Sequence, residues 1–179
     1  MRIRLAEAPD AEAIRAIYNA EVTSSVVTFD IVPWTLADQL AWLEHHRGAH
    51  PAVVATSDDG TRVEATLAPA AELTGPGAVL GFGSLSPYRP RPAYATTVED
   101  SVYVAAGARG LGAGRAILEE LVRLAGDHGF HAVIARTEGS NEPSIALHKA
   151  CGFEVVGVER EVGRKHGRWL DVIELQLLL

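Results

Sequence analysis

A strand that runs through a glycine-rich turn into a helix, over Thr97–Arg115, constrains the fold of this chain more than any other segment. Residues 101–104 alternate in polarity as a strand does, and apolar residues recur at helical spacing over 113–128. Three glycines lie at the start of that helix, within 110–114, where they permit positive φ and leave backbone N–H groups open to a ligand. The helix dipole adds to the attraction, so the junction predicts a phosphate-binding site.

The spacing of these glycines separates the junction from two nucleotide-binding motifs. The dinucleotide fingerprint needs Gly-x-Gly-x-x-Gly and a P-loop needs Gly-Lys-Ser/Thr, and the segment has neither. Residues 109–114 instead match Arg/Gln-x-x-Gly-x-Gly/Ala, the pyrophosphate loop of the GCN5-related N-acetyltransferases. A glycine-rich turn that binds no ligand would show the same residues, so the rest of the chain has to supply the context.

Composition and charge limit the class of protein. The 179 residues, 47% apolar and 22% charged, suffice for one domain with a sizeable core, which we expect to span 1–179. The net charge of −7 argues against nucleic acid or an anionic membrane as a partner. A locally basic segment at 160–168 is the exception.

The cysteine and histidine content bears on redox and metal chemistry. One cysteine excludes an internal disulfide, and the scattered histidines lack zinc-type spacing, so no metal is expected. Cys151 precedes Gly152 and is predicted to be a small buried residue rather than a nucleophile. Met1–Leu5 lacks the apolar run of a signal peptide and no stretch reaches membrane-span length, so we expect a cytoplasmic protein.

The remaining elements follow from periodicity and capping residues. A first helix is predicted to begin with Asp10 as N-cap, and a second with Thr35, where Asp38 completes the cap. A short helix is predicted after Asn141 and is closed by Gly152. Strands are predicted at 2–6, 52–56, 79–86, 132–137, 153–162 and 169–178, with a basic turn at 163–167.

Two loops separate these elements. Residues 61–78 are too long for a tight hairpin and contain prolines and glycines, so we predict an inserted, mobile loop there. Residues 87–95 carry three prolines and predict a rigid loop. The resulting order of strands and helices predicts an α/β (α+β) fold, a mixed sheet of about seven strands flanked by about four helices.

Several further motifs accompany the glycine loop. They are Ile17-Tyr18-Asn19, Thr97-Val98-Glu99 with Ser101–Val104, Asn141-x-x-Ser144-x-x-Leu147-His148 before Gly152-Phe153, and Lys165-x-Gly167-Arg168-Trp169-x-Asp171. With them the sequence resembles, over nearly its whole length, the phosphinothricin/methionine sulfoximine acetyltransferase branch of the GCN5-related N-acetyltransferases. The last motif and Thr97-Val98-Glu99 are more specific to that branch than the glycine loop.

The resemblance implies acetyl-CoA as the acetyl donor, bound where two central strands of a mostly antiparallel sheet splay apart. Backbone groups of Val102 and Val104 would pair with the pantetheine, and amides of 109–114 would hold the pyrophosphate. The implied donor-binding residues are Ser101, Val102, Tyr103, Val104, Arg109, Gly110, Leu111, Gly112, Ala113, Gly114, Arg115, Asn141 and Ser144.

The chemistry needs a base and an acid. An amine attacks a thioester only when neutral, and a free amino group is largely protonated at neutral pH, so a base must remove a proton. Glu99, at the end of the splayed strand, is the predicted base. His148 stands where most of the superfamily has a tyrosine, so the resemblance makes it the general acid or a contact of the thiol. A helix histidine satisfied by a neighbouring carbonyl is the alternative.

The resemblance implies a small glutamate-like amino acid, such as phosphinothricin, as the acceptor. Its acidic groups need cationic contacts, for which Arg89 and Lys165 are candidates, although each could be a solvated loop charge. Phe29 and Trp34 are expected to close over the carbon chain, and Trp169 to pack in the core or an interface. The predicted acceptor-binding residues are Tyr88, Arg89, Thr97, Val98, Glu99, Lys165 and Phe29.

Two other functions stay open at this stage. The acceptor could be a protein N-terminus or another amine, although the acidic chain and the branch motifs argue against it. A non-catalytic acyl-CoA-binding module is the other alternative, and the presence of both Glu99 and His148 argues against that. The resemblance also implies a homodimer.

Overall fold

The computed structural model describes residues 1–58 and 77–179, and most of the predicted insertion at 61–78 lies outside this range. Its strands are β1 (Arg2–Leu5), β2 (Ala52–Thr56), β3 (Val79–Pro87), β4 (Thr97–Val104), β5 (Ala132–Glu138), β6 (Glu154–Lys165) and β7 (Arg168–Leu178). Its α-helices are α1 (Ala11–Ser24), α2 (Leu36–His45), α3 (Ala113–Asp127) and α4 (Glu142–Ala150). Short 3₁₀ turns lie at 8–10, 92–94 and 106–108. The predicted order of strands and helices is confirmed.

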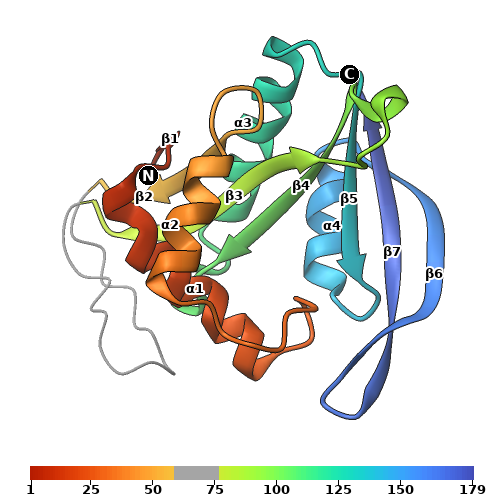
Figure 1. Ribbon diagram of the computed structural model, residues 1–179, viewed down its shortest axis with the longest axis horizontal. Coiled ribbons are helices and arrows are strands. Elements are labelled where there is room, and N and C mark those ends of the chain that lie inside the picture. The colour runs from red at the N-terminus through yellow and green to blue at the C-terminus, as the bar shows by residue number, and fades with distance from the viewer. Residues whose placement is uncertain (59–76) are drawn as a thin grey trace.

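The strands form one seven-stranded mixed sheet in the order β1-β2-β3-β4-β5-β7-β6 (Figure 1). Neighbouring strands are antiparallel except for the central pair, β4 and β5, which is parallel. That pairing runs only from Thr97 opposite Ala132 to Asp100 opposite Ala135. Beyond Asp100, β4 stays with β3 and β5 stays with β7, so the two strands diverge. The predicted splayed central pair is therefore confirmed.

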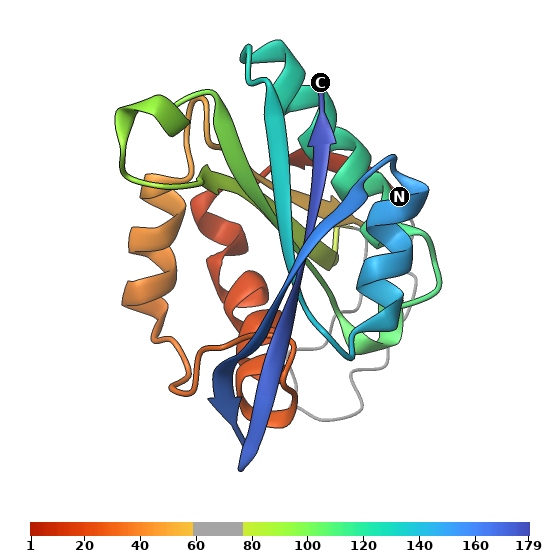
Figure 2. The same ribbon diagram turned by 90° about the vertical axis from the view of Figure 1, so that its right-hand side faces the viewer.

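Helices cover both faces of the sheet. Figures 1 and 2 show α1 and α2 on one face and α3 with α4 on the other. The side chains of Ile117, Leu118 and Leu121 of α3 are completely buried against the sheet. Helix α3 can approach because β3 has a glycine at the contact: a Cβ on Gly83 would lie 2.5 Å from Ile117 Cγ2. This close packing fixes the start of α3 relative to the end of β4.

Two of the predicted helix caps are confirmed. Thr35 and Asp38 form a reciprocal capping box at the start of α2. At the start of α4, Asn141 Oδ1 accepts a hydrogen bond from the Ser144 N–H. The cap of α4 matters for the site, because it fixes the helix that carries Ser144 and His148.

Asp10 is the N-cap residue of α1, as predicted, but its side chain makes no cap hydrogen bond to that helix. Its carboxylate instead accepts hydrogen bonds from both terminal nitrogens of Arg4, at 2.6 and 2.7 Å, and from the Glu7 N–H. A buried carboxylate is stabilised more by a bidentate guanidinium than by one amide, so the side chain turns toward β1.

The last hairpin is longer and tighter than predicted. β6 continues to Lys165, which pairs with Arg168, and leaves only His166 and Gly167 in the turn. Both turn residues have positive φ, +48° and +76°, as a two-residue turn matching the twist of the strands requires. The hairpin projects beyond the rest of the sheet (Figure 1). Within the described ranges, no helix has both the length and the apolar character needed to cross a membrane.

Candidate active site

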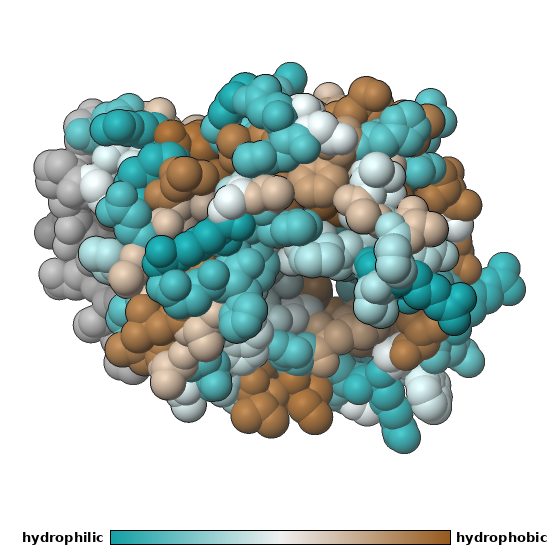
Figure 3. Space-filling model, turned by 45° about the horizontal axis from the view of Figure 1, so that its top comes forward, coloured by the Kyte–Doolittle hydropathy of each residue, from teal (hydrophilic) through white to brown (hydrophobic). Residues whose placement is uncertain are grey.

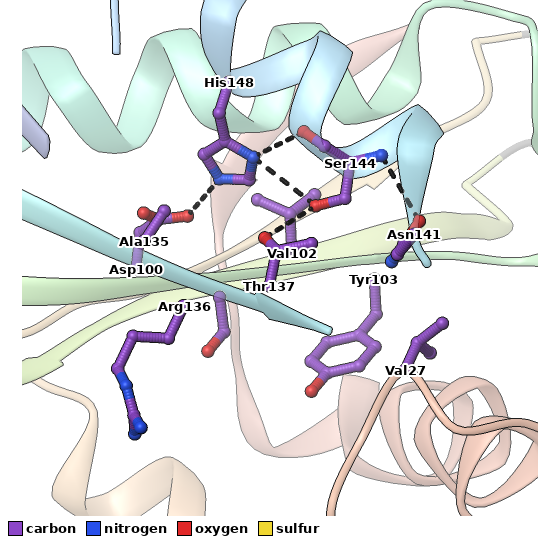
Figure 4. A pocket seen from close by; sticks show the side chains of 11 residues that line it. Val27, Asp100, Val102, Tyr103, Ala135, Arg136, Thr137, Asn141, Ser144 and His148 are labelled. Atoms are coloured by element: carbon purple, nitrogen blue, oxygen red, sulfur yellow. Dashed lines mark hydrogen bonds and ion pairs between the residues drawn. The ribbon is translucent and has the colours of Figure 1, made fainter. Parts of the chain in front are cut away.

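Two adjoining cavities lie where β4 and β5 separate. The smaller, about 70 Å³, sits in the gap and is closed on one side by α4 (Figure 4). The larger, about 550 Å³, runs from the gap to the start of α3. The residues that line both cavities are Val27, Val102, Tyr103, Asn141 and Ser144. A ligand longer than either cavity can therefore reach from the glycine loop into the gap.

The glycine loop forms the far end of the larger cavity. Gly110 and Gly112 have positive φ, +78° and +84°, although a Cβ on either would meet nothing within 4 Å. These glycines are therefore needed for backbone conformation, not for space. The helical hydrogen bonds begin with the Ala116 N–H to the Gly112 carbonyl, so the amides of 113–115 precede the ladder. Such amides at a helix N-terminus fit the phosphates of a nucleotide-bearing acyl donor.

The predicted donor-binding residues lie together with one exception. All of them line one or both cavities except Leu111, which is exposed and outside both. Arg109 forms an ion pair with Glu21 of α1, and both side chains line the larger cavity. Arg115, also at this cavity, pairs with Glu119 one helical turn on.

His148 is buried at the inner end of the gap, and both of its ring nitrogens have partners (Figure 4). Nδ1 lies 2.7 Å from the Ser144 carbonyl oxygen, which can only accept, so Nδ1 carries a hydrogen. Nε2 lies 3.0 Å from Asp100 Oδ2. Burial alone would lower the pKa of His148, but the hydrogen bond and negative charge of Asp100, helped by the Ser144 carbonyl, outweigh it and raise that pKa.

Asp100 is a site residue that the sequence reasoning missed. It is 5% exposed, and its Oδ1 has no hydrogen-bond partner within 1–58 and 77–179. The signal was present, because Val98, Asp100 and Val102 alternate along β4 on its buried side. A carboxylate in such a series needs a partner. The same series corrects the prediction for Val98, whose side chain is fully buried in the core and is not available to the acceptor.

Glu99 lies on the opposite face of β4 from Asp100 and is half-buried. Burial raises the pKa of its carboxyl, against the opposing positive charges of Arg136 and Arg89. Arg136 is itself held by Glu159 and by Glu174. In Figure 4 the Arg136 side chain points away from His148, to the other side of the strands. The predicted base and the predicted acid therefore flank β4 on its two faces.

The other predicted acceptor residues fall into two groups. Tyr88 and Arg89 lie beside the start of β4, with the Arg89 guanidinium 4.9 Å from the centre of the Tyr88 ring. Thr97 is the first residue of β4. Arg89 is exposed and near enough to Glu99 to act on its charge. This group therefore lies at the end of β4 that carries Glu99.

Phe29 and Lys165 form the second group, which joins the α1–α2 loop to the β6–β7 hairpin. Lys165 is buried, and its Nζ donates to the Thr28 carbonyl oxygen at 2.8 Å. The Phe29 ring packs on Gly163, where any larger residue would overlap it. Neither residue lines the two cavities. Trp169 is 60% exposed and stacks with Arg164, so it does not pack in the core, and its predicted place in an interface stays a prediction.

A mixed sheet whose central parallel strands part at a glycine-rich helix start defines an enzyme that handles acyl-CoA. The chain belongs to the acetyltransferase (GNAT) family, whose model matches residues 14–153. It is accordingly an N-acetyltransferase with acetyl-CoA as donor.

Relatives with solved structures or known activities cover nearly the whole chain. An L-methionine sulfoximine/L-methionine sulfone acetyltransferase of Pseudomonas aeruginosa is 36% identical, over 99% of this chain and 94% of its own. A phosphinothricin acetyltransferase from Sinorhizobium meliloti, solved in complex with acetyl-CoA, is 37% identical with a TM-score of 0.86, over 99% of this chain and 88% of its own. A structure described as ribosomal-protein-alanine N-acetyltransferase from Brucella melitensis is 36% identical with a TM-score of 0.88, over 100% of both chains.

Proposed function

We propose that this enzyme acetylates the α-amino group of a small amino acid with an oxidised tetrahedral head group, such as methionine sulfone, methionine sulfoximine or phosphinothricin. The observation that carries the proposal is the surroundings of Glu99, a half-buried carboxylate with a raised pKa and with Arg136 and Arg89 near enough to act on its charge. A base next to cations suits a substrate that carries both an amine and a carboxylate. The relatives named for these acceptors support it.

The donor half of the site fits acetyl-CoA. When bound, acetyl-CoA supplies the acetyl thioester. The amides of Gly112–Arg115 would hold its pyrophosphate, since they face the larger cavity before the helical ladder begins. The edge of β4 at 101–104 has lost β5 as a partner, so its free backbone groups can pair with the amide-bearing arm of the donor.

Glu99 removes the proton that keeps the amine from reacting. The amine reaches the donor through the gap, and Glu99 lies on β4 two residues before Ser101, which lines it. A carboxylate with a raised pKa is a stronger base than an ordinary one. Its negative charge is partly balanced by Arg136 and Arg89, so it can accept the proton without being trapped in one ion pair.

The departing thiolate takes a proton from the other face of β4. His148 holds a hydrogen on Nδ1, and the Ser144 hydroxyl lies 3.4 Å from that nitrogen and lines both cavities. In the proposed step, Ser144 gives its hydroxyl proton to the sulfur and receives the Nδ1 proton from His148. Thr137, 3.2 Å from the Ser144 oxygen, keeps the hydroxyl oriented.

Thiol release from acetyl-CoA is the experiment that tests the function. Acceptors in the panel are methionine sulfone, methionine sulfoximine, phosphinothricin, glutamate and a peptide with an N-terminal alanine. Saturable turnover with the first three supports the proposal, and Glu99→Gln should then lose about 100-fold or more in kcat while still binding acetyl-CoA. Turnover with the peptide alone would overturn the acceptor assignment.

A protein N-terminus is the second candidate acceptor. The full-length similarity to the structure described as ribosomal-protein-alanine N-acetyltransferase favours it. The net charge of −7 disfavours a ribosomal partner, because ribosomal proteins lie among anionic RNA. The peptide in the panel decides between the two.

The second part of the proposal is that the chain acts as a homodimer. Val155, Val156, Val158 and Val162 of β6 are about half exposed, as is the neighbouring Trp169 of β7. Figure 3 shows apolar side chains along the right-hand side of the view, which β6 and β7 form. Edge strands with exposed apolar side chains favour pairing with another surface.

A further inference from the structure

Five aromatic rings form a closed circle on the α1–α2 face of the sheet. Consecutive ring centres lie 5.0 Å apart for Tyr18 and Trp34, 6.4 Å for Trp34 and Trp42, and 5.9 Å for Trp42 and Phe82. The circle continues with 5.2 Å from Phe82 to Tyr103 and closes with 5.1 Å from Tyr103 back to Tyr18. The rings come from α1, α2, β3, β4 and the loop between the helices. We call this circle the five-ring cage.

The five-ring cage encloses a cavity of about 260 Å³. All five rings line it, and its polar lining consists of Asp30, Gln39, Ser84, Ser86 and Ser101. An ordinary aromatic core would fill such a space with side chains, because protein interiors are packed as tightly as organic crystals. The volume is large enough for a ligand group of a few heavy atoms.

Gln39 supplies an unsatisfied donor in this cavity. Its side chain is 1% exposed, and its Nε2 has no hydrogen-bond partner within the described part of the chain. Neighbouring polar groups are already paired: Asp30 Oδ2 accepts from Tyr18 and Trp34, and Ser86 contacts His46. A buried hydrogen-bond donor without a partner destabilises the fold by about 1–3 kcal/mol. The burial of Gln39 Nε2 is explained if an oxygen of a bound ligand accepts its hydrogen bond.

The five-ring cage is connected with the reaction site. Ser101 and Tyr103 line both this cavity and the gap between β4 and β5. Glu99 precedes Ser101 by two residues and so lies on the same face of β4. An amino acid whose amine is at Glu99 can therefore direct its side chain into the cage.

We propose that the five-ring cage binds the head group of the acceptor, with a methyl group on oxidised sulfur among the rings and an oxygen of that sulfur accepting from Gln39 Nε2. This inference rests on the proposed function and deepens it. A methyl group on an electron-poor sulfur carries partial positive charge, which aromatic faces attract as they attract cations and polarised sulfur groups.

Asp30 adds discrimination among head groups. Its carboxyl group lines the cavity, and its Oδ2 accepts hydrogen bonds from the Tyr18 hydroxyl and from Trp34 Nε1. A negatively charged phosphinate in the same cavity would be repelled, whereas a neutral sulfone or sulfoximine would not. The order of preference is therefore methionine sulfone and sulfoximine over phosphinothricin.

The test compares methionine sulfone with norleucine, which has a similar chain and no sulfur oxygens. In Gln39→Leu, kcat/KM for methionine sulfone should fall about tenfold through KM, with little change in kcat and none for norleucine. The variant should also melt at a higher temperature than the wild type, because an unsatisfied buried amide is gone. Leu40→Ala, on the exposed side of the same helix, is the control for helix α2. An unchanged KM for the sulfone overturns the inference.

A binding measurement separates this inference from the proposed function. Trp34 and Trp42 are the only tryptophans left in Trp169→Phe, and both belong to the five-ring cage. Titrating methionine sulfone into Trp169→Phe combined with Glu99→Gln should change the tryptophan emission with the same Kd that calorimetry gives. Binding without an emission change overturns the cage assignment, whether or not the wild type acetylates the sulfone. A wild type that acetylates only the peptide overturns the proposed function.

Discussion

Asp100 and His148 form a buried pair across the gap, with Asp100 Oδ2 3.0 Å from His148 Nε2 although the residues are 48 positions apart in the chain. The Ser144 carbonyl requires a hydrogen on Nδ1, and Asp100 favours a second hydrogen on Nε2, which raises the pKa of His148. An imidazole ring with hydrogens on both nitrogens can give one of them up. That is the state an acid for a thiolate needs.

Removing the carboxylate should change how activity depends on pH. In Asp100→Asn the attraction that raises the His148 pKa is lost, so burial should bring that pKa down. The basic limb of the pH profile of kcat/KM should then move to lower pH by as much as the His148 pKa falls. A fall of about one unit lowers the protonated fraction of His148 about tenfold at a fixed pH above its pKa. Asp127→Asn, at the exposed end of α3, serves as the control. An unmoved basic limb would exclude His148 as the acid.

The same variant should show a linked change in stability. The folded-state pKa of His148 is raised, so its stabilisation is fully present below the unfolded pKa of about 6.5 and is lost as pH rises through the folded value. The melting temperature of Asp100→Asn should therefore fall below that of the wild type by more at pH 5.5 than at pH 9. Thermal unfolding of both proteins at the two pH values measures this.

Glu99 should set the acid limb of the profile. Its pKa is raised by burial, so activity should fall as pH decreases through a value above the ordinary 4.5 of a glutamate. Arg136 opposes that shift, and Arg136→Gln should move the acid limb to higher pH. Arg123→Gln, on the solvent side of α3, should leave the limb in place. If the acid limb of Arg136→Gln lies at the same pH as that of the wild type, another group is the base.

The glycine loop predicts a contrast between two alanine substitutions. Gly112→Ala forces a Cβ into the left-handed region at φ +84°, which costs about 1–2 kcal/mol. We expect a lower melting temperature and a KM for acetyl-CoA raised about tenfold. Gly126→Ala, within α3 and free of contacts, should instead stabilise by about 0.5–1 kcal/mol. Equal KM values for the two variants would argue against the loop as the pyrophosphate site.

Arg89 is expected to bind the carboxylate of the acceptor. Its exposed guanidinium lies near Glu99, so Arg89→Ala should raise the acceptor KM about tenfold with a small effect on kcat and none on acetyl-CoA binding. Arg47→Ala, which removes an exposed arginine that follows α2 and pairs with Glu44, is the comparison. Steady-state kinetics with methionine sulfone decides, and an unaltered KM would remove Arg89 from the acceptor site.

The exposed valines of β6 give a test of the homodimer. Val156→Lys places a charge on a side chain that is 53% exposed and should not disturb the core. If β6 pairs with a second copy, size-exclusion chromatography with light scattering should show the wild type near twice the mass of 19.1 kDa and the variant near that mass. A wild type that runs as a monomer contradicts the proposal.

Local signals in the sequence were enough for most of the fold. The alternation in β4, the glycines at 110–114 and the cap at Asn141 each act over a few residues, so their consequences can be predicted without the structure. The family motifs predicted where the donor binds. The predicted and observed elements agree here because the strand β4, the glycine turn and the helix α3 are consecutive in the chain.

Features that join distant segments were missed. Nothing near Asp100 in the sequence indicates that His148 will face it, and the five rings of the cage come from five separate elements. The contact of the Lys165 ammonium with the Thr28 carbonyl, 137 positions away, was not predicted either, and the acceptor contact predicted for Lys165 stays a prediction. Pairings of this kind depend on how the helices lie on the sheet, which periodicity does not determine.

The bond from Lys165 to the Thr28 carbonyl spans 137 positions, and it has a consequence for how the enzyme matures. A chain leaving the ribosome folds largely from its N-terminus, and closing so long a loop comes late because of its entropic cost. The β6–β7 hairpin is synthesised after every other described element, so the loop at Thr28 stays undocked until these two strands arrive. The segment from β4 to α4, which carries the proposed donor site, is complete before the hairpin is made, so that site can form before Thr28 and Lys165 meet.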